Sequence, residues 1–211
     1  MKETADKNKP VKKKKIIISI ALIGLLTIGL ILTLILFLQD GGSDSSVPTV
    51  TIEIPEKKSA SDREPFSLQM RLSDLGDDLY PAVSFSIAFD ASKIEFLGID
   101  EGNVLVKNPD NTSGAELPEW SVNVEKANQN GIINIMYLDM TAGKHSFDKA
   151  YLETDNILLH LRFRLRGSVK NGDVLELSFE DAVFAASDEE KSLASNKGTL
   201  KTENGRIVIG E

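Results

Sequence analysis

Residues 82–89 read AVSFSIAF, and large apolar residues alternate strictly with small ones along the segment. Successive side chains of a β-strand point to opposite faces of a sheet, so this alternation predicts a strand with one buried face. The other face carries only alanine and serine. The residues predicted to face a hydrophobic core are Val83, Phe85, Ile87 and Phe89.

Residues 156–165, NILLHLRFRL, show the same alternation with a basic outer face. We expect this basic face to pair with Glu176 and Glu180 on the following strand rather than to bind a partner. The predicted core residues are Ile157, Leu159, Leu161, Phe163 and Leu165. The basic residues are Arg162, Arg164 and Arg166.

Eight further segments are short, alternating and separated by turn residues, which include three Asn-Gly pairs. About 160 residues in ten short strands are enough for two sheets around one core. The sequence therefore predicts an all-β class and a β-sandwich of nine to ten strands over residues 48–211. The eight segments are 49–54, 66–72, 93–99, 120–124, 131–138, 173–179, 182–186 and 205–210.

Residues 131–138, GIINIMYL, are largely apolar on both faces of the predicted strand. Such a strand is either central and covered on both sides, or it exposes an apolar patch. Trp120 begins a neighbouring strand with Val122 and Val124 on its own face, so we expect the indole to lie in the core.

The N-terminal region has a different composition. Residues 16–38 carry no charge and no proline, and 23 residues span about 34 Å as a helix, enough to cross a bilayer. We predict a single-pass transmembrane helix here, followed by a flexible linker at 39–47. The alternative is a cleaved secretory signal, whose apolar region is usually shorter and ends at a small-residue cleavage site.

Charge predicts the orientation of this helix. Residues 1–15 hold seven lysines against two acidic residues, whereas the chain after residue 38 holds 17 Lys and Arg against 30 Asp and Glu. Basic flanks stay on the cytoplasmic side. We therefore expect residues 1–15 to form a cytoplasmic tail at the cell membrane and residues 48–211 to lie outside the cytoplasm. The acidic domain argues against nucleic acid as a partner.

Catalysis is not predicted. The chain has no cysteine, and its two histidines, His145 and His160, have no converging ligands in the sequence, so both are expected at the surface and no metal is predicted. The acidic clusters lie at turns rather than as facing pairs across a cleft. Residues 108–119 superficially resemble a calcium loop but lack the glycine at its sixth position.

The order of these motifs resembles that of the cohesin modules of cellulosomal scaffolding proteins, over roughly residues 48–210. The resemblance implies a nine-stranded jelly-roll sandwich without an active site or cofactor. It also implies that one sheet face holds the calcium-loaded dockerin domain of a partner. The likeness is carried by VTIEI (50–54) with FSLQMRLSDL (66–75), AVSFSIAFDASKIEFLGID (82–100), NGIINIMYLDMTAG (130–143) and the block at 155–190.

The same resemblance places a docking sheet on the strands beginning near Ala82, Trp120, Gly131 and Asp173. This sequence departs from the family pattern at Ala82 and Ser84, where cellulosomal cohesins carry an Asn and an Asp; Asp139 matches an acidic residue of the family. The residues predicted to form the protein-binding face are Ser84, Ser86, Ser121, Asn123, Asn134, Met136 and Asp139.

Together these features predict a membrane-anchored, extracytoplasmic, non-catalytic interaction module that binds a dockerin-like domain or another envelope protein. One alternative is a carbohydrate-binding module that contacts cell-wall or environmental polysaccharide, although one Trp and three Tyr are few for stacking on sugars. Another is a structural domain tethered in the envelope.

Overall fold

The computed structural model describes residues 47–55 and 57–210. The predicted cytoplasmic tail, the transmembrane helix at 16–38 and nearly all of the linker lie outside the described residues. Within the described ranges, no helix is both long enough and apolar enough to span a membrane.

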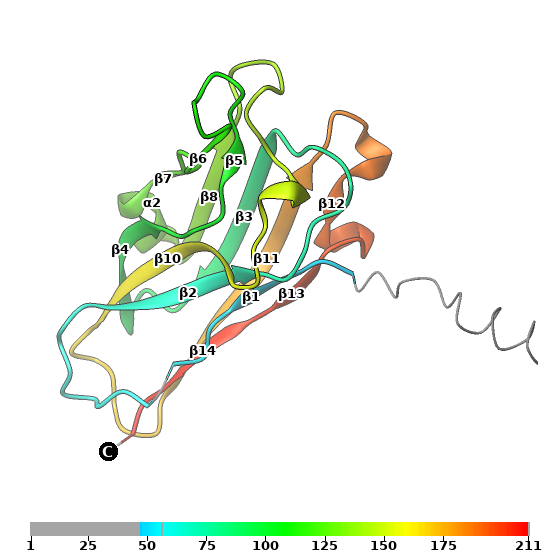
Figure 1. Cartoon of the computed structure of the whole chain (residues 1–211). Helices are drawn as coiled ribbons and strands as arrows, with labels where there is room; N and C mark the ends of the chain where they lie inside the picture. Colours follow the sequence, from blue (N-terminus) through cyan, green and yellow to red (C-terminus); the bar gives the residue numbers. More distant parts are fainter. Residues whose placement is uncertain (1–46, 56, 211) are drawn as a thin grey trace, which may run out of the picture. The chain divides into compact units, whose positions relative to one another are not determined.

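Two facing sheets form the fold, which confirms the predicted all-β sandwich (Figure 1). The first sheet has five strands in the order β13–β1–β2–β10–β4, and β13 runs parallel to β1. Its strands are β13 (Lys201–Glu203), β1 (Thr49–Ile52), β2 (Phe66–Leu72), β10 (Asn156–Leu165) and β4 (Ile94–Glu101).

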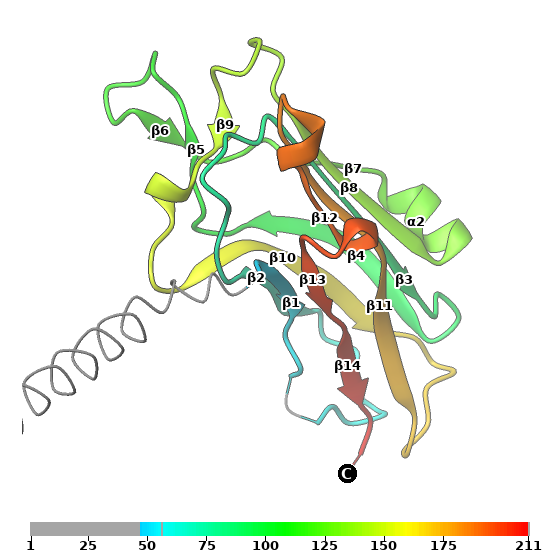
Figure 2. The same ribbon diagram turned by 90° about the vertical axis from the view of Figure 1, so that its right-hand side faces the viewer.

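The second sheet has six strands in the order β12–β11–β3–β8–β7, and β14 also pairs with β11. Figure 2 shows it as a layer beside the first sheet. The four strands predicted for the docking sheet, now β3, β7, β8 and β11, all lie in it. Its strands are β12 (Leu193–Ala194), β11 (Val174–Ala185), β3 (Ala82–Phe89), β8 (Ile132–Leu138), β7 (Ser121–Val122) and β14 (Gly205–Val208).

A small third sheet at one end of the sandwich was not predicted (Figure 1). Its order is β6–β5–β9, with β6 (Ala115–Glu116), β5 (Val106–Lys107) and β9 (Ser146–Phe147). Three single-turn 3₁₀ helices are η1 (Lys149–Tyr151), η2 (Glu189–Lys191) and η3 (Ser195–Lys197).

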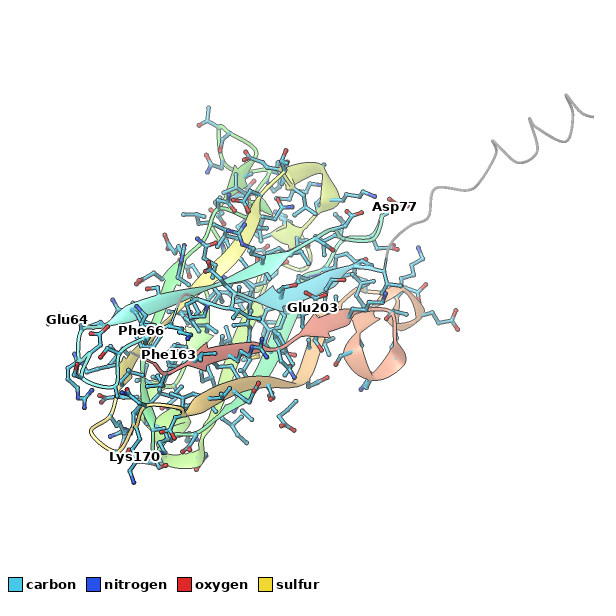
Figure 3. All side chains as sticks on the ribbon, turned by 90° about the horizontal axis from the view of Figure 1, so that it is seen from below. Glu64, Phe66, Asp77, Phe163, Lys170 and Glu203 are labelled. Atoms are coloured by element: carbon cyan, nitrogen blue, oxygen red, sulfur yellow. The ribbon has the colours of Figure 1, made fainter. Side chains whose placement is uncertain are left out.

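The core lies between the two large sheets and has the composition that alternation predicts. All four apolar residues predicted from the first segment are buried. Phe163 lies opposite Phe66 in the β10–β2 register, and their ring centroids are 6.2 Å apart (Figure 3). Trp120 is partly buried against Phe85 and Tyr137, in agreement with its predicted core position.

A β-bulge changes the predicted parity at the start of β10. The register with β2 shifts between Ile157 and Leu159, so Leu158 is buried and Ile157 is only half-buried. The prediction for Ile157 was therefore wrong, because a bulge adds one residue and reverses the alternation on one side of it. The four later core positions of β10 are buried as predicted.

The segments 173–179 and 182–186 form one continuous strand, β11, with a register shift between Phe179 and Asp181. The predicted strand at 120–124 is shorter than expected, because helix α2 (Val124–Asn130) begins inside it. The Asn123 side chain caps this helix by accepting a hydrogen bond from Lys126 N, and Gly131 ends it with a φ of 67°.

Two of the three predicted basic residues form ion pairs, although not with the predicted partners, and both lie on β10. Arg162 lies 3.5 Å from Asp100 and Arg164 lies 3.7 Å from Glu95, both on β4. The prediction of Glu176 and Glu180 as partners was wrong, because residues 166–173 carry the chain from one sheet to the other. Strands β10 and β11 follow each other in sequence but do not pair.

Asn128 of α2 forms hydrogen bonds with the backbone of β4, which lies at the edge of its sheet. Its side chain accepts a hydrogen bond from Phe96 N (2.9 Å) and donates one to Phe96 O (2.7 Å), as a neighbouring strand would. We expect Asn128→Ala to lower the free energy of unfolding by about 1–3 kcal/mol, because it leaves two backbone groups unpaired. Urea unfolding measures this. The matched control is Gln129→Ala, which removes only an exposed contact with Glu125; an equal loss in both variants would contradict the prediction.

Candidate docking face

The outer face of the second sheet brings most of the predicted binding residues together. Ser84 lies opposite Met136 and Ser86 opposite Asn134 in the β3–β8 register, and Ser121 of β7 also lies opposite Met136. Ser86 donates a hydrogen bond to the Asn134 side-chain oxygen at 2.6 Å. Six of the seven predicted residues line one shallow depression: Ser84, Ser86, Ser121, Asn123, Asn134 and Met136.

This surface is uncharged and combines small polar side chains with exposed apolar ones. On the outer side of β8, Ile132, Met136 and Leu138 are 38%, 50% and 54% exposed. Of the two alternatives for this strand, the structure therefore shows the exposed apolar patch. Across β3 and β8, no outward position carries a charge: Ala82, Ser84, Ser86, Ala88, Ile132, Asn134, Met136 and Leu138. We call these eight residues the docking face.

Asp139 lies apart from the depression, at the end of β8. Its carboxylate accepts hydrogen bonds from Thr141 N, the Thr141 hydroxyl and Gly143 N, and so holds the loop that follows the strand. Burial alone would raise the pKa of this carboxyl, but these hydrogen bonds outweigh it and hold the pKa below its usual range. Asp139 therefore shapes the rim of the face rather than its centre.

Several residues at this rim were not predicted as functional. His145, expected at the surface, is only 23% exposed in its side chain, and its Nδ1 lies 3.1 Å from Glu116 Oε1. Tyr137 donates a hydrogen bond to His145 O. This cluster could not be predicted, because the strands that carry Glu116 and the residues next to His145 are only two residues long.

Within residues 47–55 and 57–210, no group of three or more His, Cys, Asp or Glu residues is placed to hold a metal ion. The loop at 108–119 uses its own polar groups: Asn108 bonds Glu116 and Asp110 N, and Asn111 bonds Ala115 O.

The model of the family described as "Cohesin domain" matches residues 50–202, which is most of the chain. The chain belongs to the cohesin family. Cohesin modules are non-catalytic interaction domains that bind dockerins. A comparison with curated protein sequences found no significant match.

Solved cohesin structures share the fold. The third cohesin of ScaC from Acetivibrio cellulolyticus, solved with the ScaB dockerin, is 16% identical, with a TM-score of 0.56 over 78% of this chain and 99% of that chain. The OlpA cohesin of Clostridium thermocellum, solved in a dockerin complex, is 19% identical, with a TM-score of 0.54 over 78% and 99%. A non-cellulosomal cohesin from the archaeon Archaeoglobus fulgidus is 12% identical, with a TM-score of 0.50 over 79% and 93%.

This cohesin lacks an exposed aromatic row for sugar stacking among the described residues. Its one Trp packs against Phe85, Tyr137 and Phe147. Tyr80 and Tyr137 are buried, and the Tyr151 hydroxyl is bonded to Gly114 O.

The loop that follows β8 contains a residue with a strained backbone. Ala142 has a φ of 61°, in the left-handed region that glycine adopts more easily. We expect Ala142→Gly to raise the free energy of unfolding by about 1 kcal/mol, because it relieves this strain. Urea unfolding is the measurement. Ala88→Gly, at a paired position within β3, is the matched control and should instead lose about 0.5–1 kcal/mol. Destabilisation by both changes would contradict the assignment of strain to Ala142.

Proposed function

We propose that this cohesin is a membrane-anchored adaptor that docks a dockerin-like protein outside the cytoplasm through the docking face. The observation that carries this proposal is the uncharged outer surface of β3 and β8, with Met136 and Leu138 half exposed in an otherwise acidic domain. Protein interfaces are depleted of charge at the centre and polar at the rim, and exposed apolar patches often mark them.

The departures at Ala82 and Ser84 bear on the partner. Without the Asn and Asp of the cellulosomal pattern, the centre of the face offers hydroxyls, one amide and aliphatic surface. Such a surface favours a partner with an uncharged contact region, because a charged side chain buried there would lack a counter-ion. We therefore expect a dockerin-like partner that differs from those of the cellulosome.

Capture from native envelope extract tests this proposal. The bait is residues 47–211, which form a compact unit by themselves. We expect the bait to retain a protein with a dockerin-like calcium-binding sequence in calcium buffer and to release it in chelator. The captured protein is then produced alone and titrated by calorimetry. Retention only of proteins without such a sequence, or binding that chelator does not change, would contradict a dockerin-like partner.

The anchor part of the proposal rests on the uncharged run at 16–38 and the basic residues before it. We expect the cell-associated protein to keep its N-terminal region, because the run is long enough to span a bilayer and no small-residue cleavage site follows. N-terminal sequencing of the protein from isolated membranes is the measurement. A mature start near Gly41 would show instead that the protein is secreted.

A further inference from the structure

The sulfur atoms of this chain are unevenly placed. The chain has no cysteine and four methionines, so methionine thioethers are its only sulfur groups. Met1 lies outside the described residues, and Met70 on β2 is fully buried. Met136 on β8 is 50% exposed, and Met140 in the loop that follows is 84% exposed. Among the described residues, sulfur that solvent can reach is therefore confined to the docking face and its rim.

Met136 is the main exposed apolar side chain of the depression in the docking face. This depression has a volume of about 390 Å³ and is lined by residues of β3, β7 and β8. Of the other large apolar residues in its lining, Phe85 and Ile135 are buried and Val122 is half-buried. A protein that docks over the depression would therefore make its principal apolar contact there with the Met136 thioether.

Small, uncharged side chains flank Met136 on both sides. In the sheet register, Met136 lies opposite Ser84 of β3 and opposite Ser121 of β7, and both serines are exposed. No outward residue of β3 or β8 carries a charge. A half-exposed thioether between such small neighbours is open to a small neutral reagent, and its reactivity follows this exposure.

We propose that Met136 is a modification site at which hydrogen peroxide oxidises the thioether and thereby weakens docking. This inference rests on the proposed docking function. The sulfur lone pair attacks one peroxide oxygen and the O–O bond breaks, which gives methionine sulfoxide and water; sulfur loses two electrons and peroxide gains them. Oxidation turns a flexible apolar side chain into a polar one. The docked protein would then bury a new hydrogen-bond acceptor in a contact fitted to a thioether, which costs affinity.

The modification itself is tested without a partner, on the full chain in lipid nanodiscs. The protein is treated with hydrogen peroxide, the reaction is stopped with catalase at timed intervals, and peptide mass spectrometry follows the addition of one oxygen atom at each methionine. We expect Met136 to be oxidised at least about tenfold faster than Met70, which is the buried internal control. Oxidation of Met136 as slow as that of Met70 would overturn the inference.

The effect on docking is measured by calorimetry with the captured partner, which is added only after catalase has removed the peroxide. We expect oxidation to weaken binding by wild type about tenfold or more, while circular dichroism shows that the domain stays folded. Met136→Leu has a side chain of similar volume that peroxide cannot oxidise, so treatment should not change its affinity. Met140→Leu is the matched control: it keeps Met136, so its affinity should fall on treatment as that of wild type does.

The test separates this inference from the docking proposal. Methionine sulfoxide reductases of both types, one for each sulfoxide epimer, should restore the affinity of oxidised wild type. Unchanged affinity of wild type after oxidation, or an equal loss in Met136→Leu, would overturn the inference and leave docking intact. If untreated protein captures no dockerin-like protein, the docking proposal and the effect of oxidation on it are both contradicted, whereas the oxidation rates of Met136 and Met70 still decide whether the modification site exists.

Discussion

Phe163→Ala is expected to lower the free energy of unfolding of the domain by about 3–5 kcal/mol, as is usual when a buried phenylalanine is truncated. Phe163 is fully buried, and its ring centroid lies 5.6 Å from that of Phe96, 6.1 Å from Phe89 and 6.2 Å from Phe66. These three neighbours come from both large sheets, so the cavity would lie between the layers. Urea unfolding of residues 47–211 measures the loss.

Phe85→Ala should lower the free energy of unfolding by a similar amount. Phe85 lies on β3, in the sheet opposite that of Phe163. Phe85 is also fully buried, and its ring packs against Phe184 at 5.7 Å and Trp120 at 6.1 Å. Ile54→Ala is the control, because that side chain is 53% exposed and should cost less than about 1 kcal/mol. A loss below about 1 kcal/mol in either phenylalanine variant would contradict the core described for this sandwich.

Ser86→Arg and Asn134→Arg are each expected to weaken docking by about a hundredfold or more, without unfolding the domain. The two residues face each other at mid-strand, and an arginine there would be covered by the partner without a counter-ion. An uncompensated buried charge costs several kcal/mol, and 1.4 kcal/mol is already tenfold in affinity. Biolayer interferometry against the captured partner measures the effect, and circular dichroism checks folding.

The matched control is Ser67→Arg. It makes the same chemical change at an exposed position of β2, on the outer face of the other sheet. This variant should bind as wild type does. If all three arginine variants bind equally well, the partner does not cover the docking face.

Alternation was a good guide wherever a strand packs one face on the core. The outer residues of β3 could be assigned from the sequence, because their inner neighbours, such as Phe85, had to be buried. For β8, which is apolar on both faces, the resemblance to cohesins supplied the shared surface. The same reasoning failed at Ile157, since a bulge cannot be read from polarity alone. It also failed for the arginine stripe, because parity gives the face of a strand but not its neighbour in the sheet.

The rim of the docking face could not be predicted from the sequence, for a different reason. At the end of β8, Glu119 and Met140 line a common hollow although they are distant in sequence, and the nearby strands of two residues have no periodicity to detect. Helix α2 was missed because seven residues with one fully buried side chain, Ala127, give too short a pattern. Resemblance to cohesins supplied the docking sheet, but not these details of its edge.

The central claim is that docking uses the face of β3 and β8 rather than the basic face of β10. The most direct test is calorimetric titration of the captured partner against Ser86→Arg and Arg164→Glu, one variant on each sheet. Because Arg164 is already paired with Glu95, we predict that Arg164→Glu binds within about tenfold of wild type, whereas Ser86→Arg binds about a hundredfold or more weakly. Wild-type affinity in Ser86→Arg together with loss of binding in Arg164→Glu would place the site on the opposite sheet and contradict this account.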